Sequence, residues 1–141
     1  MTMKINRQAG FTLIELLVVM VILGLLAALV VPNYMKQGDK ARVNTTRAQI
    51  EMLGTALDTF RLDVGRYPTS QEGLEALRSR PSGLDRWDGP YLKKEVPKDG
   101  WDNPFVYQSP GEREAYELQS YGADGIAGGS DINSDLNSWE G

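Results

Sequence analysis

The feature that most constrains this chain is an apolar run near its N-terminus, at residues 11–31. At about 1.5 Å per residue, a helix of this length spans about 30 Å, enough to cross the hydrocarbon core of a bilayer. Lys4 and Arg7 precede the run, which favours a cytoplasmic N-terminus with the rest of the chain outside. A cleaved secretory signal fits less well, because no A-x-A pattern precedes Ala28 and Glu15 interrupts the apolar core.

Glu15 is the only charged residue within this run. An acid inside a membrane segment is costly, so its presence is by default a functional hypothesis. If the chain is cut after Gly10, Phe11 gains a positive α-amino group one helical turn from Glu15. That amine could pair with Glu15 of the same chain or of a neighbouring subunit. The alternative is an acid that snorkels to the membrane interface.

Composition narrows the function classes. The 141 residues include no cysteine and no histidine, and the net charge is −4. A disulfide, a thiolate nucleophile and a zinc–thiolate site are therefore excluded, and the commonest general base is missing. The negative charge disfavours a nucleic-acid partner. We expect a protein that is not an enzyme, with one modest domain, in which any bound metal is a hard cation held by oxygen atoms.

The helical pattern continues beyond the apolar run to about Asp63. Apolar residues recur near the i, i+3, i+4, i+7 spacing of an amphipathic helix, with charged residues on the other face. The apolar set is Ile50, Leu53, Leu57, Phe60, Leu62 and Val64. Pro32 and Gly38 are expected to kink or locally melt this helix. Gly65 and the following Tyr67-Pro68 are expected to end it.

The remainder of the chain predicts a small α+β head. Thr69 or Ser70 is expected to cap a short helix that reaches about Arg80. Residues 105–108 and 116–120 are typical of two antiparallel strands joined by a turn at residues 109–112. We expect a small antiparallel sheet laid on the second half of the long helix.

Residues 119–139 form an acidic, glycine-rich segment. Oxygen-bearing side chains gather in it, and its glycines allow backbone carbonyls to turn inward, which suits the six to eight oxygen ligands of Ca²⁺. An EF-hand is rejected, because Leu136 stands where that loop needs glycine and the twelfth-position glutamate is missing. From composition alone, a calcium site and a solvated acidic loop remain equally open interpretations.

The N-terminal sequence G-F-T-L-I-E, with its basic leader and apolar helix, resembles the class III signal of type IV pilins and pseudopilins. Later segments sharpen the resemblance toward the major pseudopilins of type II secretion systems. These segments are Y-P-T-S-Q-E-G-L at residues 67–74, G-W-D-N-P-F at 100–105, S-P-G at 109–111, G-A-D-G at 122–125 and D-L-N-S-W at 135–139. The resemblance covers nearly the whole chain.

The resemblance implies a role for several residues. A prepilin peptidase would cut between Gly10 and Phe11 and methylate the new Phe11 amine, and Glu15 would set the register between subunits. One structural Ca²⁺ is implied in the acidic loop, held by Asp124 and Asp135 and by the backbone oxygens of Tyr121 and Ile126. The middle ligand is left open between Ser130, Asp131 and Ser134.

The implied fold is the type IV pilin-like fold, a long helical spine with a small head. Residues 1–10 would be the cleaved leader and 11–32 the transmembrane and assembly helix. Residues 33–64 would be the amphipathic half of the spine and 65–141 the periplasmic head, with the calcium-type loop at 119–139. The mature protein would cross the bacterial inner membrane once and then enter a periplasmic pseudopilus.

The implied function is that of a structural subunit of this pseudopilus, which would drive the export of folded proteins across the outer membrane. Its partners would be further copies of itself, minor pseudopilins, the prepilin peptidase, the inner-membrane assembly platform and membrane lipid, but no nucleic acid. The first alternative is a type IV pilin for adhesion or motility, although such pilins often close with a disulfide. A hydrolase using Asp124 and Asp135 belongs to a different class, but these acids lie in a glycine-rich loop without an apparent apolar pocket to raise a pKa. A membrane-tethered calcium-dependent binding module leaves the long helix and the Gly10–Phe11 junction unexplained.

Overall fold

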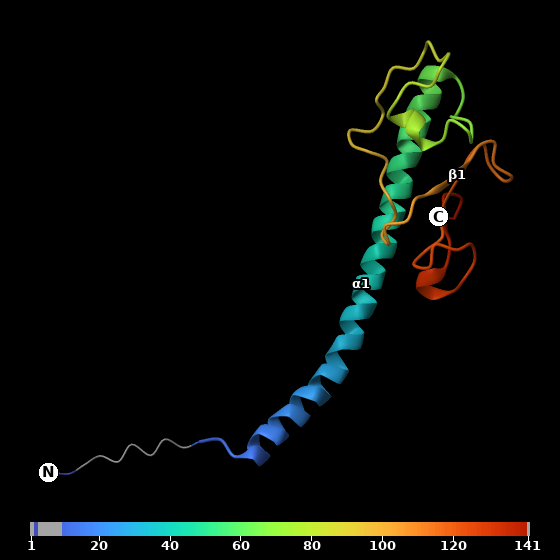
Figure 1. Cartoon of the computed structure of the whole chain (residues 1–141). Helices are drawn as coiled ribbons and strands as arrows, with labels where there is room; N and C mark the ends of the chain where they lie inside the picture. The colour runs from blue at the N-terminus through green and yellow to red at the C-terminus, as the bar shows by residue number, and fades with distance from the viewer. Residues whose placement is uncertain (1, 3–9, 141) are drawn as a thin grey trace. The chain divides into compact units, whose positions relative to one another are not determined.

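The computed structural model describes residue 2 and residues 10–140. Along the chain, these residues form helix α1 (Leu13–Val64), the 3₁₀ helix η1 (Leu74–Leu77), strands β1 (Val106–Gln108) and β2 (Glu117–Ser120), the 3₁₀ helix η2 (Asp131–Asn133) and strand β3 (Leu136–Asn137) (Figure 1). The backbone divides into two units, one that ends at Gly38 and one that begins at Asp39. Helix α1 contributes to both units, and each unit is described by itself.

Both ends of α1 are set by local chemistry. The Thr12 hydroxyl oxygen accepts a hydrogen bond from the Glu15 N–H at 3.2 Å, the interaction of an N-cap residue. At the other end, Gly65 has a φ of 94° and its N–H donates to the Arg61 carbonyl at 2.7 Å. Glycine adopts this left-handed conformation without a steric penalty, so it closes the last turn. The predicted helix end near Asp63 is therefore confirmed to within one residue.

The expectation that Pro32 or Gly38 locally melts the helix is wrong, because α1 is continuous through both residues. A proline in a helix removes one N–H donor, while the other hydrogen bonds of the ladder can persist. Next to it, the Asn33 side-chain amide donates to the Leu29 carbonyl at 3.4 Å. A glycine in a helix is disfavoured by only about 1 kcal/mol relative to alanine. The alternative expectation, a kink at these residues, stays a prediction.

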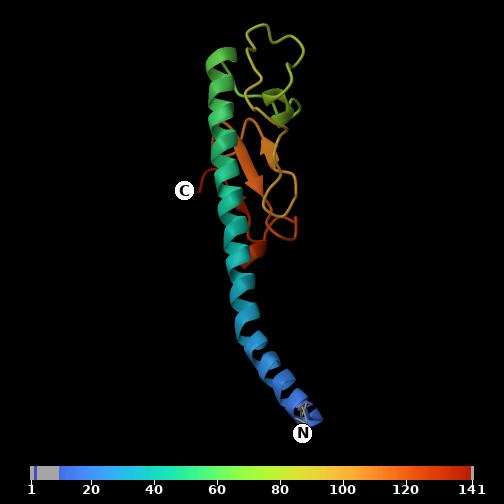
Figure 2. The ribbon, with the colours of Figure 1, turned by 90° about the vertical axis from the view of Figure 1, so that its left-hand side faces the viewer.

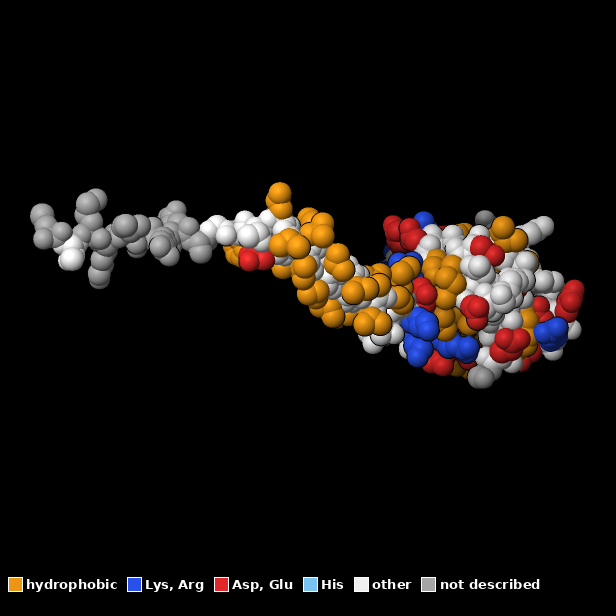
Figure 3. Space-filling model, turned by 90° about the horizontal axis from the view of Figure 1, so that it is seen from below, with side chains coloured by type: hydrophobic (Ala, Val, Ile, Leu, Met, Phe, Trp, Pro, Cys, Tyr) orange, Lys and Arg blue, Asp and Glu red, His pale blue; other side chains and the backbone are white. Residues whose placement is uncertain are grey.

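The first half of α1 presents its apolar side chains outward. Every large hydrophobic side chain from Leu13 to Val31 is at least 46% exposed. In the space-filling view of Figure 3, hydrophobic side chains cover this stretch of helix on the face shown. By length and composition, α1 is long and apolar enough to cross a membrane. The expected apolar segment is thus a helix whose surface is not covered by any described part of its own unit.

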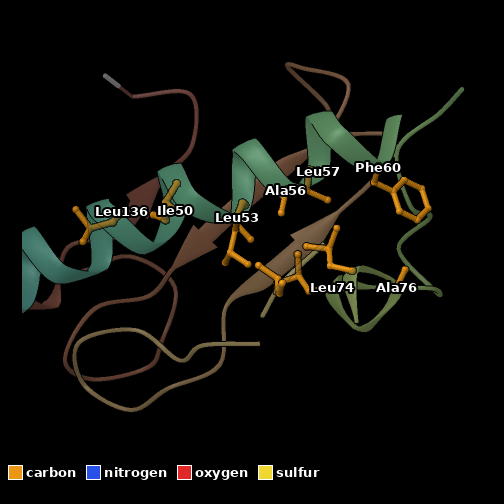
Figure 4. Close-up of a cluster of buried hydrophobic side chains, with 11 residues drawn as sticks. Ile50, Leu53, Ala56, Leu57, Phe60, Leu74, Ala76 and Leu136 are labelled. Carbon is orange, nitrogen blue, oxygen red and sulfur yellow. The ribbon is translucent and has the colours of Figure 1, made fainter. Parts of the chain in front are cut away.

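The second half of α1 buries one face in the head. Its buried residues are Thr46, Ile50, Leu53, Ala56, Leu57 and Phe60, which recur every three or four positions. All of them except Thr46 pack with Leu74, Ala76, Leu77, Leu92, Leu118 and Leu136 in one hydrophobic core, part of which Figure 4 shows. Leu62 was predicted to join this face, but its side chain is 85% exposed. Two residues beyond Phe60 correspond to about 200° of helical rotation, so Leu62 points the other way.

The head contains a three-stranded antiparallel sheet in the order β1-β2-β3. Tyr107 pairs with Leu118, and Ser120 pairs with Leu136. The sheet lies along the second half of α1 (Figure 2) and contributes Leu118 and Leu136 to the core. The predicted hairpin is confirmed, although its connection is longer than the four-residue turn expected. Strand β3 was not predicted, because two residues carry no periodicity.

The predicted helix from Thr69 to Arg80 is only partly present. The Thr69 hydroxyl accepts from the Glu72 N–H at 3.2 Å, and the Glu72 carboxylate accepts from the Thr69 N–H at 2.9 Å, which is a complete capping box. An ion pair and hydrogen bond with Arg66 lower the pKa of the Glu72 carboxyl below its usual range. Gly73 then has a φ of 65° and interrupts the helix, so only the 3₁₀ turn η1 follows.

Tyrosine rings close one side of the head. The rings of Tyr67 and Tyr116 meet edge to face with centroids 4.7 Å apart, and the Tyr107 hydroxyl donates to the Pro68 carbonyl at 2.7 Å. Burial raises the pKa of Tyr107 and of Tyr116 to about 12. Both phenols therefore stay neutral in the folded head at pH values where a free tyrosine ionises.

Candidate functional site

The first candidate site is the junction between Gly10 and Phe11. Phe11 is 91% exposed, and an added side chain at Gly10 would meet no atom within 4 Å. Both residues precede the first residue of α1, Leu13, and have no regular secondary structure. Exposed, non-helical backbone is what a peptidase requires of its substrate. The geometry therefore suits cleavage at this junction.

Glu15 lies in the first turn of α1 and is exposed. A carboxylate is favoured at this end of a helix, because the unpaired N–H groups give it a partial positive charge. Among the described residues, the ion pairs are those of Arg66 with Glu72 and of Arg80 with Asp85, so neither involves Glu15. The Glu15 carboxylate is thus available for a partner such as an α-amino group.

The second candidate site is the acidic loop that follows β2. The chain leaves Ser120 and turns at Gly122, which has a φ of 75°, and the Gly125 N–H donates to the Gly122 carbonyl at 3.3 Å. This turn carries Asp124, which is exposed and whose Oδ1 accepts from the Ile126 N–H at 3.1 Å. Among the described residues, no hydrogen bond ends on the carbonyl oxygen of Tyr121 or of Ile126.

The opposite side of the loop holds the other predicted ligands. Both carboxylate oxygens of Asp135 accept from the Gly128 N–H at 3.0 Å, so this carboxylate faces the loop backbone. Asp131 is exposed and opens η2 with a φ of 53°, while the Ser130 carbonyl accepts from the Asn133 N–H. The Ser134 carbonyl lies next to Gly122, since a Cβ added there would be 2.8 Å from it.

The structure thus brings the two sides of the loop together without clustering its acids. The Ala123 N–H donates to the Ile132 carbonyl at 2.9 Å, which joins the turn of Asp124 to the stretch before Asp135. Within residues 10–140, no three acidic side chains form a group close enough to share a metal ion. The oxygen atoms of the loop therefore come from carboxylates that stand apart and from backbone carbonyls, a mixture that suits Ca²⁺ rather than a transition metal.

Two residues that hold this loop in place, Asp99 and Asn103, were not predicted from the sequence. Asp99 is 5% exposed, and its carboxylate accepts a hydrogen bond from the Ser120 hydroxyl at 2.6 Å. Asn103 donates from its side chain to the Gly122 carbonyl at 3.2 Å. The only sequence signal was the D-G-W-D-N stretch at residues 99–103, in which an acid sits among turn-forming residues.

A helix with an exposed apolar first half, whose second half carries a small antiparallel sheet, defines a type IV pilin-like subunit. The chain belongs to the family of protein G of the type II secretion system. The model of that family, described as "Type II secretion system (T2SS), protein G", matches residues 33–139. A model described as "Prokaryotic N-terminal methylation motif" matches residues 5–31.

Two relatives and one solved structure support the assignment of the chain to this family. The chain is 48% identical over 143 residues to type II secretion system core protein G of Pseudomonas aeruginosa, with 98% of this chain and 99% of that protein covered. It is 41% identical over 139 residues to the protein of the same name from Vibrio cholerae, with 96% and 94% covered. Its fold matches the crystal structure of the major pseudopilin from the type 2 secretion system of enterohaemorrhagic Escherichia coli. That match has a TM-score of 0.62 at 35% identity and covers 78% of this chain and 96% of that one.

These findings confirm the predicted family and fold, and they favour a pseudopilus subunit over a type IV pilus subunit. The solved neighbour is named a major pseudopilin, which favours a structural role over catalysis. The apolar helix suggests anchoring in a membrane. The calcium ligands, the cleavage site and the register residue stay predictions.

Proposed function

We propose that this chain is a subunit of a type II secretion pseudopilus that polymerises through the first half of α1 and drives the export of folded proteins across the outer membrane. The observation that carries this is the exposed apolar surface from Leu13 to Val31, on a chain whose second unit completes its own core. Exposed apolar surface of this extent requires a membrane or other copies of the helix to cover it. A membrane covers it before assembly, and neighbouring subunits cover it afterwards.

Processing would convert the membrane form into the assembly form. A prepilin peptidase cuts between Gly10 and Phe11, which are accessible, and methylates the Phe11 amine. Before the cut, the subunit crosses the inner membrane once, with its head in the periplasm, in agreement with the basic residues ahead of the apolar run. The new positive amine pairs with Glu15 of a neighbouring subunit and so fixes how far each subunit rises along the filament.

The partners follow from this sequence of events. They are membrane lipid, the peptidase, an inner-membrane assembly platform, minor pseudopilins and further copies of the chain. A net charge of −4 disfavours nucleic acid. We assign no catalytic residue to the chain.

The test compares the unchanged chain with Glu15→Ala in a secreting cell. We expect the unchanged protein to have the mass of a chain that starts at methylated Phe11 and to form sheared filaments. Glu15→Ala should insert and fold but lose the filaments and secretion. The matched control is Glu51→Ala, which removes an exposed acid elsewhere on α1 and should assemble. Filaments formed equally by both variants, or an unprocessed chain that starts at Met1, would refute the proposal.

We further propose that one Ca²⁺ binds the acidic loop and locks it onto the head. The residues fit such an ion in donor chemistry. Asp124 and Asp135 supply carboxylates, and the carbonyls of Tyr121 and Ile126 accept no hydrogen bond from the described residues. Of the three alternatives for the middle ligand, the position of the Ser134 carbonyl next to Gly122 favours Ser134. The bound ion would supply charge that draws these oxygens together.

Melting of the full-length chain in detergent micelles tests the calcium proposal. A ligand at about 100 times its Kd stabilises the folded state by about 2.7 kcal/mol. The melting temperature should therefore rise when millimolar Ca²⁺ replaces a chelator. Asp124→Ala should abolish this rise, while Glu112→Ala, which removes an exposed acid on the β1–β2 connection, should preserve it. An identical melting temperature of the unchanged chain with chelator and with Ca²⁺ would exclude the site.

A further inference from the structure

The buried carboxylate of Asp99 is hydrogen-bonded to Ser120 at the start of the acidic loop, and it is not one of the predicted ligands of that loop. Asp99 Oδ2 accepts a hydrogen bond from the Ser120 hydroxyl at 2.6 Å. Asp99 Oδ1 accepts from the backbone N–H groups of Trp101 at 3.0 Å and of Asn103 at 2.9 Å. A carboxylate that is withdrawn from water must satisfy its oxygens with such donors, and in return it fixes the backbone that carries them.

These hydrogen bonds close into a ring that includes the first residue of the loop turn. The Gly122 N–H donates to the Ser120 hydroxyl oxygen at 3.3 Å. The Gly122 carbonyl accepts from the Asn103 side-chain amide at 3.2 Å. The ring therefore runs from Asp99 through Ser120 to Gly122, and returns through Asn103 to Asp99. Both polar groups of the Gly122 backbone are held by residues that depend on Asp99.

Gly122 is the point where the two sides of the acidic loop meet. Its carbonyl also accepts from the Gly125 N–H, which closes the turn that carries Asp124. A Cβ at Gly122 would lie 2.8 Å from the carbonyl oxygens of both Ile132 and Ser134. A shift of Gly122 would therefore move Asp124 relative to Ser134, and with them the oxygens on both sides of the loop.

The same segment is fixed to α1. The Gly100 N–H donates to the Thr46 hydroxyl oxygen at 2.8 Å, and Thr46 is fully buried. Gly100 approaches the helix so closely that a Cβ there would lie 2.5 Å from the Arg42 carbonyl oxygen. The ring around Asp99 is thus anchored on the helix rather than on another loop.

We propose that Asp99 is a positioning residue for cation binding by the acidic loop. Its carboxylate holds the Gly122 backbone through Ser120 and Asn103, and so sets the distance between the oxygens on the two sides of the loop. Asp99 does not contact the cation. This inference rests on the calcium site proposed above. Partners that orient metal ligands typically change metal affinity by 10- to 100-fold when they are removed.

The experiment titrates Ca²⁺ alone into the full-length chain in detergent micelles and measures the Kd by calorimetry. Asp99→Asn removes the charge, and Asn103→Ala removes the arm to the Gly122 carbonyl with less disturbance of the core. The control is Asp102→Asn, which makes the same change of charge three residues away on an exposed side chain. Asp102 has a φ of 64°, which asparagine also tolerates. We expect the Kd to rise at least tenfold in both test variants and to stay within twofold of the unchanged chain in the control.

Melting of the variants in chelator distinguishes a positioning role of Asp99 from a purely structural one. If both test variants melt at a lower temperature but bind Ca²⁺ with unchanged Kd, Asp99 is only structural and the inference is overturned. If Asp99→Asn does not fold, the Kd of Asn103→Ala decides in the same way. If the unchanged chain binds no Ca²⁺, the calcium site itself is wrong. If the unchanged chain binds Ca²⁺ and all variants bind it with the same Kd, the calcium site stands and only the proposed role of Asp99 is refuted.

Discussion

Both halves of α1 are rich in large apolar side chains, but the two halves use these side chains for different purposes. From Leu13 to Val31 the helix is apolar on every face apart from Glu15, and its large side chains are exposed, whereas from Thr46 to Phe60 it is apolar on one face and that face is buried. Burying a large aliphatic or aromatic side chain contributes about 1.5–3 kcal/mol. The second half gains this stabilisation within its own chain, while the first half can gain it only from lipid or from other helices.

Because of this difference, the folding of the head and the assembly of subunits depend on different halves of α1. A change in the buried half should alter the free energy of unfolding of the head, and a change in the apolar half should alter insertion or filament formation. All tryptophans of the chain, Trp87, Trp101 and Trp139, lie after residue 64, so their fluorescence follows the head. The predictions below compare matched substitutions in the two halves, beginning with the largest expected effect.

Phe60→Ala should have the largest effect on the head. Phe60 is fully buried and meets Tyr91 edge to face with ring centroids 5.6 Å apart. Truncating a buried phenylalanine costs about 3–5 kcal/mol of unfolding free energy. Urea unfolding of the full chain in detergent, followed by tryptophan fluorescence, measures this loss. The matched change Val19→Ala should leave the urea midpoint unchanged and reduce filament yield instead. Equal midpoint shifts for the two variants would show that the two halves of α1 do not differ in their contribution to folding.

Gly100→Ala should have the next largest effect. A Cβ at Gly100 would lie 2.5 Å from the Arg42 carbonyl oxygen and 2.9 Å from the Arg42 Cα, so the loop must move away from the helix. Forcing extra atoms into such a contact costs about 1–3 kcal/mol. The matched change in the apolar half is Gly24→Ala, which meets no atom within 4 Å and should not destabilise the helix. The melting temperature of the head distinguishes them, and an unchanged value for Gly100→Ala would contradict the close approach.

Alkaline pH should weaken the head and leave the apolar half intact. Burial raises the pKa of Tyr107 and Tyr116 to about 12, whereas tyrosine in an unfolded chain ionises near 10. The neutral phenols therefore stabilise the head fully below pH 10, and this contribution is lost as the pH rises from 10 to 12. Urea midpoints measured between pH 9 and about 12 should fall over that range. Tyr107→Phe should reduce this fall in the urea midpoint. If the midpoint falls as much in Tyr107→Phe as in the unchanged chain, a group other than Tyr107 is responsible for the loss of stability.

Leu62→Ala should have the smallest effect, although it lies in the buried half of α1. Its side chain is 85% exposed, and surface substitutions of this kind usually change stability by less than about 0.5 kcal/mol. Leu57→Ala, five residues earlier and fully buried, should cost about 2–5 kcal/mol. A large loss for Leu62→Ala in the urea experiment would mean that position along the helix, rather than the face, decides the contribution.

The sequence predicted the features that depend on local pattern. The apolar run, the end of α1 near Gly65 and the hairpin each follow from spacing or from a glycine at the right position. The helix after Thr69 shows the limit, because its capping box formed but Gly73 stopped the helix at once. Whether a glycine adopts a positive φ depends on the surrounding fold, which composition does not contain.

The candidate sites were predictable to different degrees. Gly10, Phe11 and Glu15 stand out because each departs from its neighbours in an otherwise uniform segment. The acidic loop stands out by composition, but its cross-loop contacts depend on β3, whose two residues gave no signal. Asp99 could not be predicted, because its partner Ser120 lies 21 positions away and meets it only in the folded head.

The position of β3 also sets an order of events during synthesis. Leu136, in this strand, belongs to the same core as Ile50 and Leu53, so the head cannot complete its core until Leu136 has been synthesised and has emerged. The apolar half of α1 is complete by Val31. Contacts between residues distant in the chain form later than local ones. The membrane segment can therefore be inserted while the head is still unfolded, and a nascent chain would reach its place in the bilayer before it has a folded surface to offer a neighbour.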